Sequence, residues 1–406
     1  KVSISKNNLF GAKSGQSVLV DIISWGDDNN LDIRGKVVKV FNSLDDHNWT
    51  MESILVENGF SSTYPEEVLK ELDNISGEIT EKEISKRRDF RKVLTFTIDP
   101  DTAKDFDDAL SYEEHENGDI EIGVHIADVT HYVKPKTALD KEAYNRSTSV
   151  YLVDRCIAML PEKLSNNLCS LNPNEDKLVF SASFTFNNKF KLIKEWFGKA
   201  IIHSDNRFTY DEGQDSLDNP DGLYHRELTV VNKIAHKLRK AKFKAGAIAF
   251  ESDEIKFKLD ENNKPVDVYV KERKDIHMLI EDFMLIANKR VAHFMATKKE
   301  GQEIPFVYRI HGEPDTERLA DLSLFMKEMG IKLDLSTPDK IAKSFNKLSE
   351  KSKKDPAAKL LMGFAIRTMS KAIYSSNNIG HYGLHFEHYS HFTSPIRRYS
   401  DVIAHR

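Results

Sequence analysis

Cysteine is almost absent from this 406-residue chain, which contains only Cys156 and Cys169 and no Cys-x-x-Cys pair. So few cysteines exclude a disulfide-stapled scaffold and a zinc site built from thiolates, and they favour a reducing compartment. We therefore expect a cytoplasmic protein. No uncharged apolar run reaches the ~18 residues that a membrane span needs, and the N-terminus carries no signal-peptide pattern. The sequence thus predicts no membrane partner.

A large excess of charge of one sign is also missing, since 59 lysines and arginines stand against 64 aspartates and glutamates for a net charge of −5. This balance argues against indiscriminate polyanion binding, but it leaves room for a local basic groove. With 18 glycines, 12 prolines and 40% hydrophobic residues, the chain is neither fibrous nor of low complexity. Because it begins at Lys1 rather than Met, we expect a fragment or a processed form.

Strand-like and helical patterns alternate along the chain, which predicts an α+β fold. Residues 45–90 are helical and charged, and residues 91–406 form a large mixed unit that turns mainly helical from about 228. Thr337-Pro338 has the form of a helix N-cap followed by a first-turn proline. The patterns predict strands over 17–25, 33–41, 93–98 and 120–126, a strand pair over 177–203, and a helix over 276–296.

An acidic run follows the predicted strand 93–98 directly. Five aspartates fall within ten residues: Asp99, Asp101, Asp105, Asp107 and Asp108. Carboxylates this close raise one another's pKa unless a positive charge lies among them. Ligands that are all oxygen suit hard cations such as Mg²⁺, Mn²⁺ or Ca²⁺, and a pair of such ions can stabilise both oxygens of a phosphoryl displacement. The run is thus a candidate metal site.

Two other interpretations of the acidic run were weighed. An EF-hand loop that starts at Asp99 would place Lys104 where glycine is required and Leu110 where the bidentate glutamate is required, so the EF-hand is excluded. A solvated acidic surface loop stays open, because most charge runs are of that kind. The position at the end of an apolar strand favours a functional site over that alternative.

Basic and aromatic residues interleave near the C-terminus, over residues 380–406. Ser394-Pro395-Ile396-Arg397-Arg398 reads as a helix start with two arginines, and such a start attracts anions. Aromatic and basic neighbours suit the stacking of bases and the binding of phosphates. Any single histidine here is better explained as a packed polar residue, but the Arg397–Arg398 cluster favours function. A lysine stripe at 233, 237, 240 and 244 is either the wet face of a helix or one wall of a polyanion channel.

Taken together, the acidic run and the Ser394–Arg398 segment resemble the ribonuclease II/ribonuclease R family, whose catalytic unit is the RNB domain. The similarity extends over most of the chain, including residues 124–133, 159–171, 275–288 and 308–311. Within the family the chain is most similar to its bacterial ribonuclease R branch. The resemblance implies a partial cold-shock (OB-type) domain over 1–44, a connector over 45–90 and an RNB domain over 91–406 that lacks its C-terminal end.

The resemblance implies processive 3′→5′ hydrolysis of RNA to nucleoside 5′-monophosphates. It implies one or two Mg²⁺ ions, replaceable by Mn²⁺, at Asp99, Asp105, Asp107 and Asp108. By this resemblance Asp99 and Asp108 would be the direct ligands, with Asp105 supporting them. Asp107 would position the 3′-terminal nucleotide or the attacking water, and Arg397 would contact the scissile phosphate. The implied RNA-binding residues are Tyr151, Phe250, Arg397 and Arg398.

The expected partner is single-stranded RNA or RNA with a 3′ overhang, bound by a monomer. A non-catalytic RNA-binding regulator on the same fold is the alternative, but a degenerate member should have lost some of the four aspartates, and all four are present. A DNA-directed or structure-specific endonuclease would share the same metal chemistry. Telling RNA from DNA requires contact with the 2′-hydroxyl, and no residue is assigned to that contact.

Overall fold

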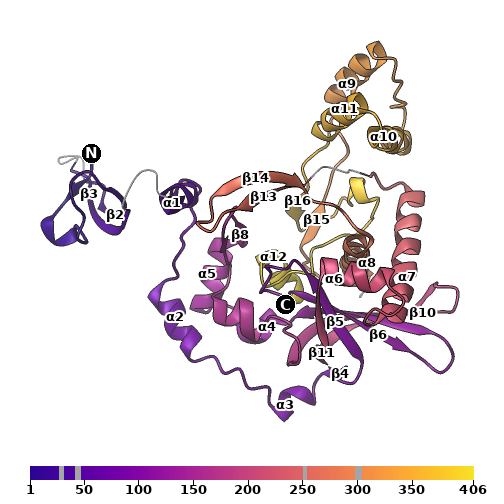
Figure 1. Ribbon diagram of the computed structural model, residues 1–406, viewed down its shortest axis with the longest axis horizontal. Helices are drawn as coiled ribbons and strands as arrows, with labels where there is room; N and C mark the ends of the chain where they lie inside the picture. The colour runs from indigo at the N-terminus through magenta and orange to yellow at the C-terminus, as the bar shows by residue number, and fades with distance from the viewer. Residues whose placement is uncertain (27–31, 42–46, 250–253, 298–303) are drawn as a thin grey trace. The chain divides into compact units, whose positions relative to one another are not determined.

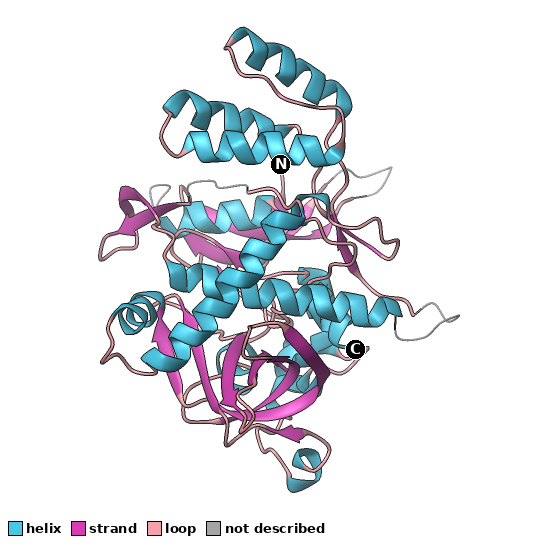
Figure 2. Ribbon diagram, turned by 90° about the vertical axis from the view of Figure 1, so that its right-hand side faces the viewer, coloured by secondary structure: helices cyan, strands magenta, loops and turns pink. Residues whose placement is uncertain are grey.

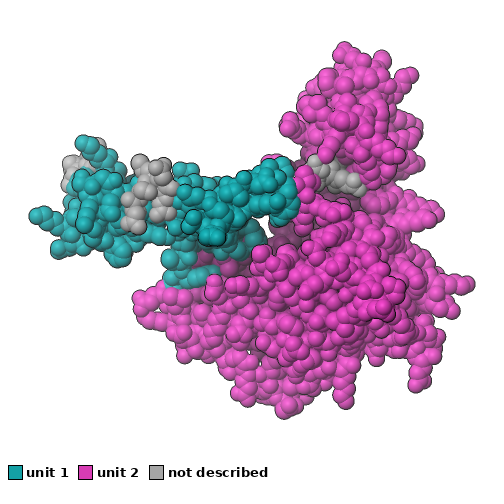
Figure 3. Space-filling view, viewed as in Figure 1, with its two compact units in different colours: residues 1–65, 150–157, 255–269 teal, residues 66–149, 158–254, 270–406 magenta. Residues whose placement is uncertain are grey.

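The computed structural model describes the chain except for residues 27–31, 42–46, 250–253 and 298–303. The described residues form two compact units, which Figure 3 colours separately. Within these residues every helix is too short or too polar to traverse a lipid bilayer. Unit 1 consists of residues 1–65, 150–157 and 255–269, and unit 2 of residues 66–149, 158–254 and 270–406.

Unit 1 is built on a small sheet at the N-terminal end of the chain. The predicted strands 17–25 and 33–41 are confirmed as β2 (Ser17–Ser24) and β3 (Arg34–Phe41), which pair antiparallel. Residues 27–31 between these two strands lie outside the described residues. The remaining elements are β1 (Ser3–Ile4), η1 (Lys6–Asn8), α1 (His47–Glu57), β8 (Val150–Tyr151), β9 (Cys156–Ile157), β13 (Ile255–Leu259) and β14 (Pro265–Val270).

A seven-stranded sheet organises unit 2, in the order β12-β5-β6-β7-β10-β11-β4. The five central strands run antiparallel, while the edge strands β12 and β4 pair in parallel with their neighbours. The strands predicted at 93–98, 120–126 and 177–203 are all confirmed. The bounds are β4 (Arg88–Asp89), β5 (Leu94–Asp99), β6 (Asp108–Glu114), β7 (Ile120–Ala127), β10 (Asp176–Phe186), β11 (Leu192–His203) and β12 (Asn206–Thr209).

Two long helices, α7 (His225–Ala245) and α8 (Asp275–Thr297), cover one face of this sheet. Apolar residues spaced three and four apart put one stripe of each helix against the strands, and Phe283 of α8 is fully buried in the shared core. Figure 2 shows the strands curving beside the helices. The predicted α+β class is therefore confirmed, and so is the helix predicted over 276–296.

Three further helices of unit 2 have a core of their own. α9 (Thr316–Glu328), α10 (Pro338–Ser352) and α11 (Pro356–Arg367) enclose Phe345 and Met326, and they stand together at the top of Figure 1. Thr337 caps α10 by accepting a hydrogen bond from Lys340 N, with Pro338 in the first turn, as predicted. The other elements are α2 (Glu66–Asp73), α3 (Glu81–Ile84), α4 (Val129–Tyr132), α5 (Ala138–Arg146), η2 (Lys163–Leu168), α6 (Tyr210–Asp218), β15 (Tyr308–Ile310), β16 (Ile373–Ser375), η3 (Tyr382–Leu384) and α12 (Tyr399–His405).

Candidate active site

The acidic run lies at one edge of the large sheet. Asp99 is the last residue of β5 and Asp108 is the first residue of β6. Because β5 and β6 are antiparallel neighbours, the end of one and the start of the other meet at the same edge. The loop between them therefore begins and ends with a carboxylate, and the predicted position at a strand end is confirmed.

Burial dominates the electrostatics of these carboxyl groups. Burial, with repulsion from Asp108 and then from Asp105, raises the pKa of Asp99 to about 8. Burial likewise raises the pKa of Asp108 to about 6, although Arg397 and Arg398 oppose that shift. Asp107 is only 3% exposed, and burial raises its pKa well above the usual range against the opposing effect of Arg397. The loop thus carries less positive charge than its carboxylates require.

The donor set fits a hard divalent cation. The Oδ2 atoms of Asp99 and Asp107 are buried and accept no hydrogen bond within the described residues. Buried oxygens normally have a partner, so two such atoms in one loop indicate that a ligand from outside the chain completes the site. An all-oxygen set selects Mg²⁺, Mn²⁺ or Ca²⁺ rather than a soft metal.

The aspartates are nevertheless not drawn into one closed ligand shell. In the part of the chain that the structure describes, the only three histidine, cysteine or acidic side chains with ligand atoms all within 4.8 Å of one another are Glu113, His115 and Glu121. Glu121 of that group is already neutralised by Arg88, whose Nη2 lies 2.6 Å from Glu121 Oε1. One carboxylate of that cluster is therefore already paired with an arginine, whereas the loop aspartates are not gathered within that distance of one another.

Arg397 reaches the acidic loop from the C-terminal segment. Its Nε lies 3.4 Å from Asp107 Oδ2, and its Nη2 donates a hydrogen bond of 3.0 Å to Ser394 Oγ. The backbone N–H of Ile396 donates to Asp107 Oδ1 at 2.8 Å. The Arg397 side chain stays 44% exposed, so the guanidinium is held beside the carboxylates and is also open to solvent. The two predicted motifs therefore meet in space.

The expected helix start at Ser394-Pro395 is wrong. Residues 395–397 form a turn, and α12 begins at Tyr399. The amide groups that a helix N-terminus would present to an anion are already used, since Ser394 N donates to Asp401 Oδ1 and Ile396 N to Asp107. Arg398 directs its Nε and Nη2 to the fully buried Asp401, at 3.0 and 2.8 Å. This pairing fixes the segment that carries Arg397.

Sequence reasoning missed Tyr210, the first residue of α6. Its neighbour Thr209 pairs in register with Asp99, and burial together with the charges of Asp108 and Asp99 raises the pKa of the Tyr210 hydroxyl. The Tyr210 ring stacks on His277, with centroids 4.0 Å apart and planes inclined by 16°. Only the parallel pairing of β12 with β5 brings this tyrosine to the loop, and no local pattern signals that pairing.

The remaining predicted residues are not brought to this loop by the described contacts. Tyr151 belongs to β8 of unit 1 and is 57% exposed. Phe250 lies outside the described residues. Their roles as RNA-stacking aromatics therefore stay predictions. All four stripe lysines are exposed on α7, as the wet face of an amphipathic helix requires, and Lys237 Nζ donates to the backbone oxygen of Lys189.

Comparison with known proteins gives two family matches. The RNB domain family matches residues 87–406, and the cold shock domain family matches residues 1–65. Ribonuclease R of Thermotoga maritima is 39% identical over 99% of this chain and 57% of its own length, and ribonuclease R of Aquifex aeolicus is 37% identical over 100% and 58%. An Arabidopsis thaliana relative named inactive exonuclease DIS3L2 is 33% identical over 98% of this chain and 40% of its own length.

A solved structure supports the same similarity. Mycoplasma genitalium RNase R, in complex with ribose-methylated single-stranded RNA, matches with a TM-score of 0.87 and 29% identity, over 100% of this chain and 63% of that one. The chain thus spans 57–58% of the length of the two bacterial relatives.

Proposed function

The chain belongs to the RNB-domain family, and from that premise we propose that it is the catalytic part of a 3′→5′ exoribonuclease. In this proposal it hydrolyses single-stranded RNA, or RNA with a 3′ overhang, processively to nucleoside 5′-monophosphates, and it acts as a monomer. The observation that carries the proposal is the meeting of a half-exposed arginine with buried, under-neutralised carboxylates: Arg397 Nε lies 3.4 Å from Asp107 Oδ2. That combination suits hydrolysis of a phosphodiester.

Four aspartates of the loop would hold one or two Mg²⁺ ions, with Mn²⁺ as a substitute: Asp99, Asp105, Asp107 and Asp108. A bound cation supplies charge neutralisation to the phosphate oxygens and activation to the attacking water. The Oδ2 atoms of Asp99 and Asp107, which accept no hydrogen bond within the described residues, and the raised pKa values of the loop carboxyls support this assignment. Asp105 shares in the mutual repulsion that raises the pKa of Asp99, which places it within electrostatic reach of the same centre.

In the proposed mechanism Asp107 orients the attacking water or the 3′-terminal nucleotide. Its Oδ1 is fixed by the N–H of Ile396, while its Oδ2 faces Arg397. Arg397 binds the scissile phosphate, since a guanidinium fork matches phosphate oxygens and this one is reachable from solvent. Developing negative charge on the phosphate would therefore meet a fixed positive group, which stabilises the transition state more than the ground state.

The RNA-binding part of the proposal rests on the residues of the family motif. Tyr151 and Phe250 would stack on the terminal bases, because stacking tolerates every base and so permits degradation of any sequence. Arg398 would bind the RNA backbone. In this structure its guanidinium is paired with Asp401. The Mycoplasma relative was solved with single-stranded RNA, which supports RNA as the substrate class.

A digest of end-labelled RNA tests the proposal. The substrate carries a 3′ overhang, and the reaction is run with Mg²⁺ and with EDTA beside a DNA strand of the same sequence. We expect Mg²⁺-dependent release of nucleoside monophosphates from RNA alone. Internal fragments would instead establish an endonuclease. RNA binding without any product would establish the non-catalytic alternative. The test includes that outcome because the Arabidopsis relative is named as inactive.

A further inference from the structure

One arginine from an edge strand holds the first half of the acidic loop. Arg207 lies on β12, where it pairs in register with Thr97 of β5. Its Nη2 donates to the carbonyl oxygens of Pro100 and Asp101, at 2.8 and 2.9 Å. Its Cζ also lies 5.6 Å from the ring centroid of Phe106. A single guanidinium therefore spans the loop from its beginning to its end.

A buried serine holds the second half of the loop. Ser170 is fully buried, and its Oγ donates to the carbonyl of Lys104 at 2.8 Å and accepts the N–H of Phe106 at 3.0 Å. The next residue, Leu171, donates its N–H to the carbonyl of Phe106 at 3.0 Å. The backbone just before Asp107 is thus fixed by a segment more than sixty residues away along the chain.

The charge of Arg207 lowers the pKa of Asp99, but what the two residues have in common is their contact with the loop backbone. In the described part of the chain Arg207 forms no ion pair with a carboxylate, and its Nη2 donates to the backbone carbonyls of Pro100 and Asp101. Ser170 is neutral. A loop with this many like charges expands unless its backbone is held, because the carboxylates repel one another at low local dielectric. The two side chains supply that restraint.

We propose that Arg207 and Ser170 are positioning residues that set the spacing of Asp99 relative to Asp105–Asp108, and thereby set the affinity of the loop for a divalent cation. The inference rests on the proposed function, since it concerns the same site. Groups that orient metal ligands typically change metal affinity by about 10–100-fold when they are removed. Because both residues contact the loop backbone, they would act through the aspartates.

The experiment measures Mn²⁺ binding directly, by the EPR signal of free Mn²⁺, in the full chain and its variants. Arg207→Lys keeps the charge but shortens the side chain and removes the planar guanidinium that lies near Phe106, and Ser170→Ala removes the hydroxyl from the other half of the loop. We expect each to weaken Mn²⁺ binding about tenfold. Raising Mg²⁺ should restore the RNA hydrolysis rate in both, while RNA affinity measured in EDTA stays unchanged. Arg226→Lys, at an exposed arginine paired with Glu114, is the matched control.

The outcomes separate this inference from the function it rests on. If Asp99→Asn leaves Mn²⁺ binding untouched, the loop holds no metal, and the proposed function falls with the inference. If Asp99→Asn abolishes Mn²⁺ binding but folded Arg207→Lys and Ser170→Ala both bind Mn²⁺ like wild type, only the positioning role is overturned. Should Arg207→Lys fail to fold by circular dichroism, Ser170→Ala decides alone. A loss of rate that excess Mg²⁺ does not rescue would also contradict the inference.

Discussion

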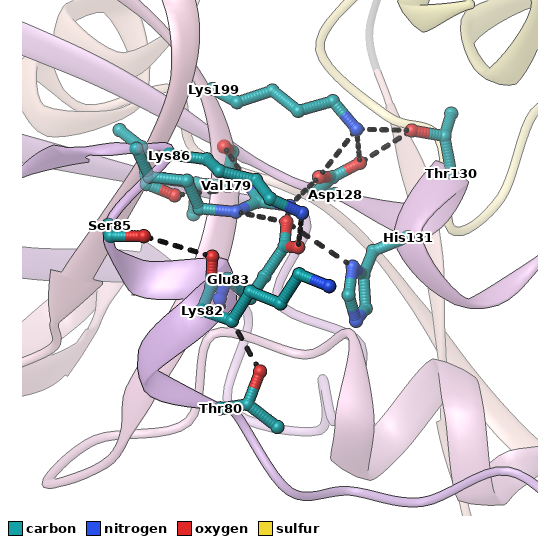
Figure 4. A network of polar contacts seen from close by, with 12 residues as sticks. Thr80, Lys82, Glu83, Ser85, Lys86, Asp128, Thr130, His131, Val179 and Lys199 are labelled. Carbon is teal, nitrogen blue, oxygen red and sulfur yellow. Dashed lines mark hydrogen bonds and ion pairs between the residues drawn. The ribbon is translucent and has the colours of Figure 1, made fainter.

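Asp107 and Asp128 are both buried aspartates of unit 2, at 3% and 1% exposure. Their surroundings nevertheless raise the pKa of Asp107 and lower the pKa of Asp128. Asp128 lies 2.8 Å from Arg87 and 3.0 Å from Lys199, and it accepts a hydrogen bond of 2.6 Å from Thr130. Figure 4 shows the Asp128 carboxylate beside Lys199 and Thr130. Burial acts to raise its pKa, but Lys199 and Arg87 outweigh burial and hold the pKa well below the usual range.

The acidic loop shows the opposite balance. Burial raises the pKa of Asp107 despite the nearby Arg397, and the Oδ2 of Asp107 accepts no hydrogen bond within the described residues. The Asp128 network is complete without any ligand, and it joins the connector before β4 to the sheet through Glu83 and Arg87. The acidic loop, in contrast, is incomplete without a ligand. The raised pKa of Asp107 and the lowered pKa of Asp128 therefore reflect how far neighbouring positive charges offset the burial of each carboxylate.

The largest expected effect is on Asp107→Asn. The amide cannot bind a cation or orient water as the carboxylate does, so hydrolysis should fall by roughly a thousandfold or more. Single-turnover release of monophosphates from end-labelled RNA measures the rate, and filter binding in EDTA should show unchanged RNA affinity. Asp101→Asn, at an exposed aspartate of the same loop, is the control and should keep the wild-type rate. Wild-type release by Asp107→Asn would remove the loop from the mechanism.

Arg397→Ala should rank second. Removing one donor from a developing oxyanion typically costs about a hundredfold to a thousandfold in rate, and the loop aspartates remain to hold the cation. Mn²⁺ binding should therefore survive while single-turnover hydrolysis slows. Arg226→Ala serves as control, because that arginine is exposed and paired with Glu114. An unaltered rate in Arg397→Ala would show that the guanidinium beside Asp107 is structural, like the one beside Asp128.

Asp128→Asn should affect stability instead of catalysis. It removes one of the two carboxylates that neutralise the buried Arg87, the other being Glu83, and breaking a buried pair in this way costs about 3–5 kcal/mol in the free energy of unfolding at pH 7. Because folding lowers the pKa of Asp128, its contribution is present above the unfolded value of ~3.9 and is lost as the pH falls through the folded value. The difference between wild type and variant in urea melts should hence shrink below about pH 4.

The control for that measurement is Asp89→Asn, because Asp89 and its partner Arg91 are 47% and 33% exposed. Such a pair contributes about 0–1 kcal/mol, so the variant should unfold at nearly the wild-type urea concentration. A destabilisation by Asp128→Asn that persists undiminished at pH 3 would contradict the electrostatic account and indicate lost packing instead.

The sequence alone was sufficient to predict where the acidic loop lies. A strand that runs directly into aspartates predicts a carboxylate cluster at a sheet edge, and Asp99 and Asp108 lie there. The arginine partner came from the family motif, because no spacing rule brings residue 397 to residue 107. The helix expected at Ser394 is interrupted for a long-range reason: the N–H of Ser149 and the hydroxyl of Thr148 donate to the carbonyl of Arg397, and the backbone of Arg398 is extended.

The side chains that hold the loop are invisible to pattern reading. Arg207 and Ser170 bind backbone carbonyls and amides, so no complementary charge or spacing marks them in the sequence. The Asp128 network was missed for a similar reason. Arg87, Asp128 and Lys199 come from three separate segments that only the sheet order brings together. Local patterns predict which elements form, and pairing between distant elements decides which side chains meet.

The smallest expected effect is stabilisation by the cation itself. At ten times its dissociation constant a ligand that binds only the folded state adds about 1.4 kcal/mol, which for a chain of this size is roughly 1–2 °C in Tm. Mg²⁺ should raise the Tm of wild type and of Asp128→Asn equally, but it should leave Asp99→Asn unchanged, with KCl at matched ionic strength as the control. Equal shifts in all three proteins would mean that the cation acts by screening, and that the loop carboxylates are no more a binding site than the Asp128 network.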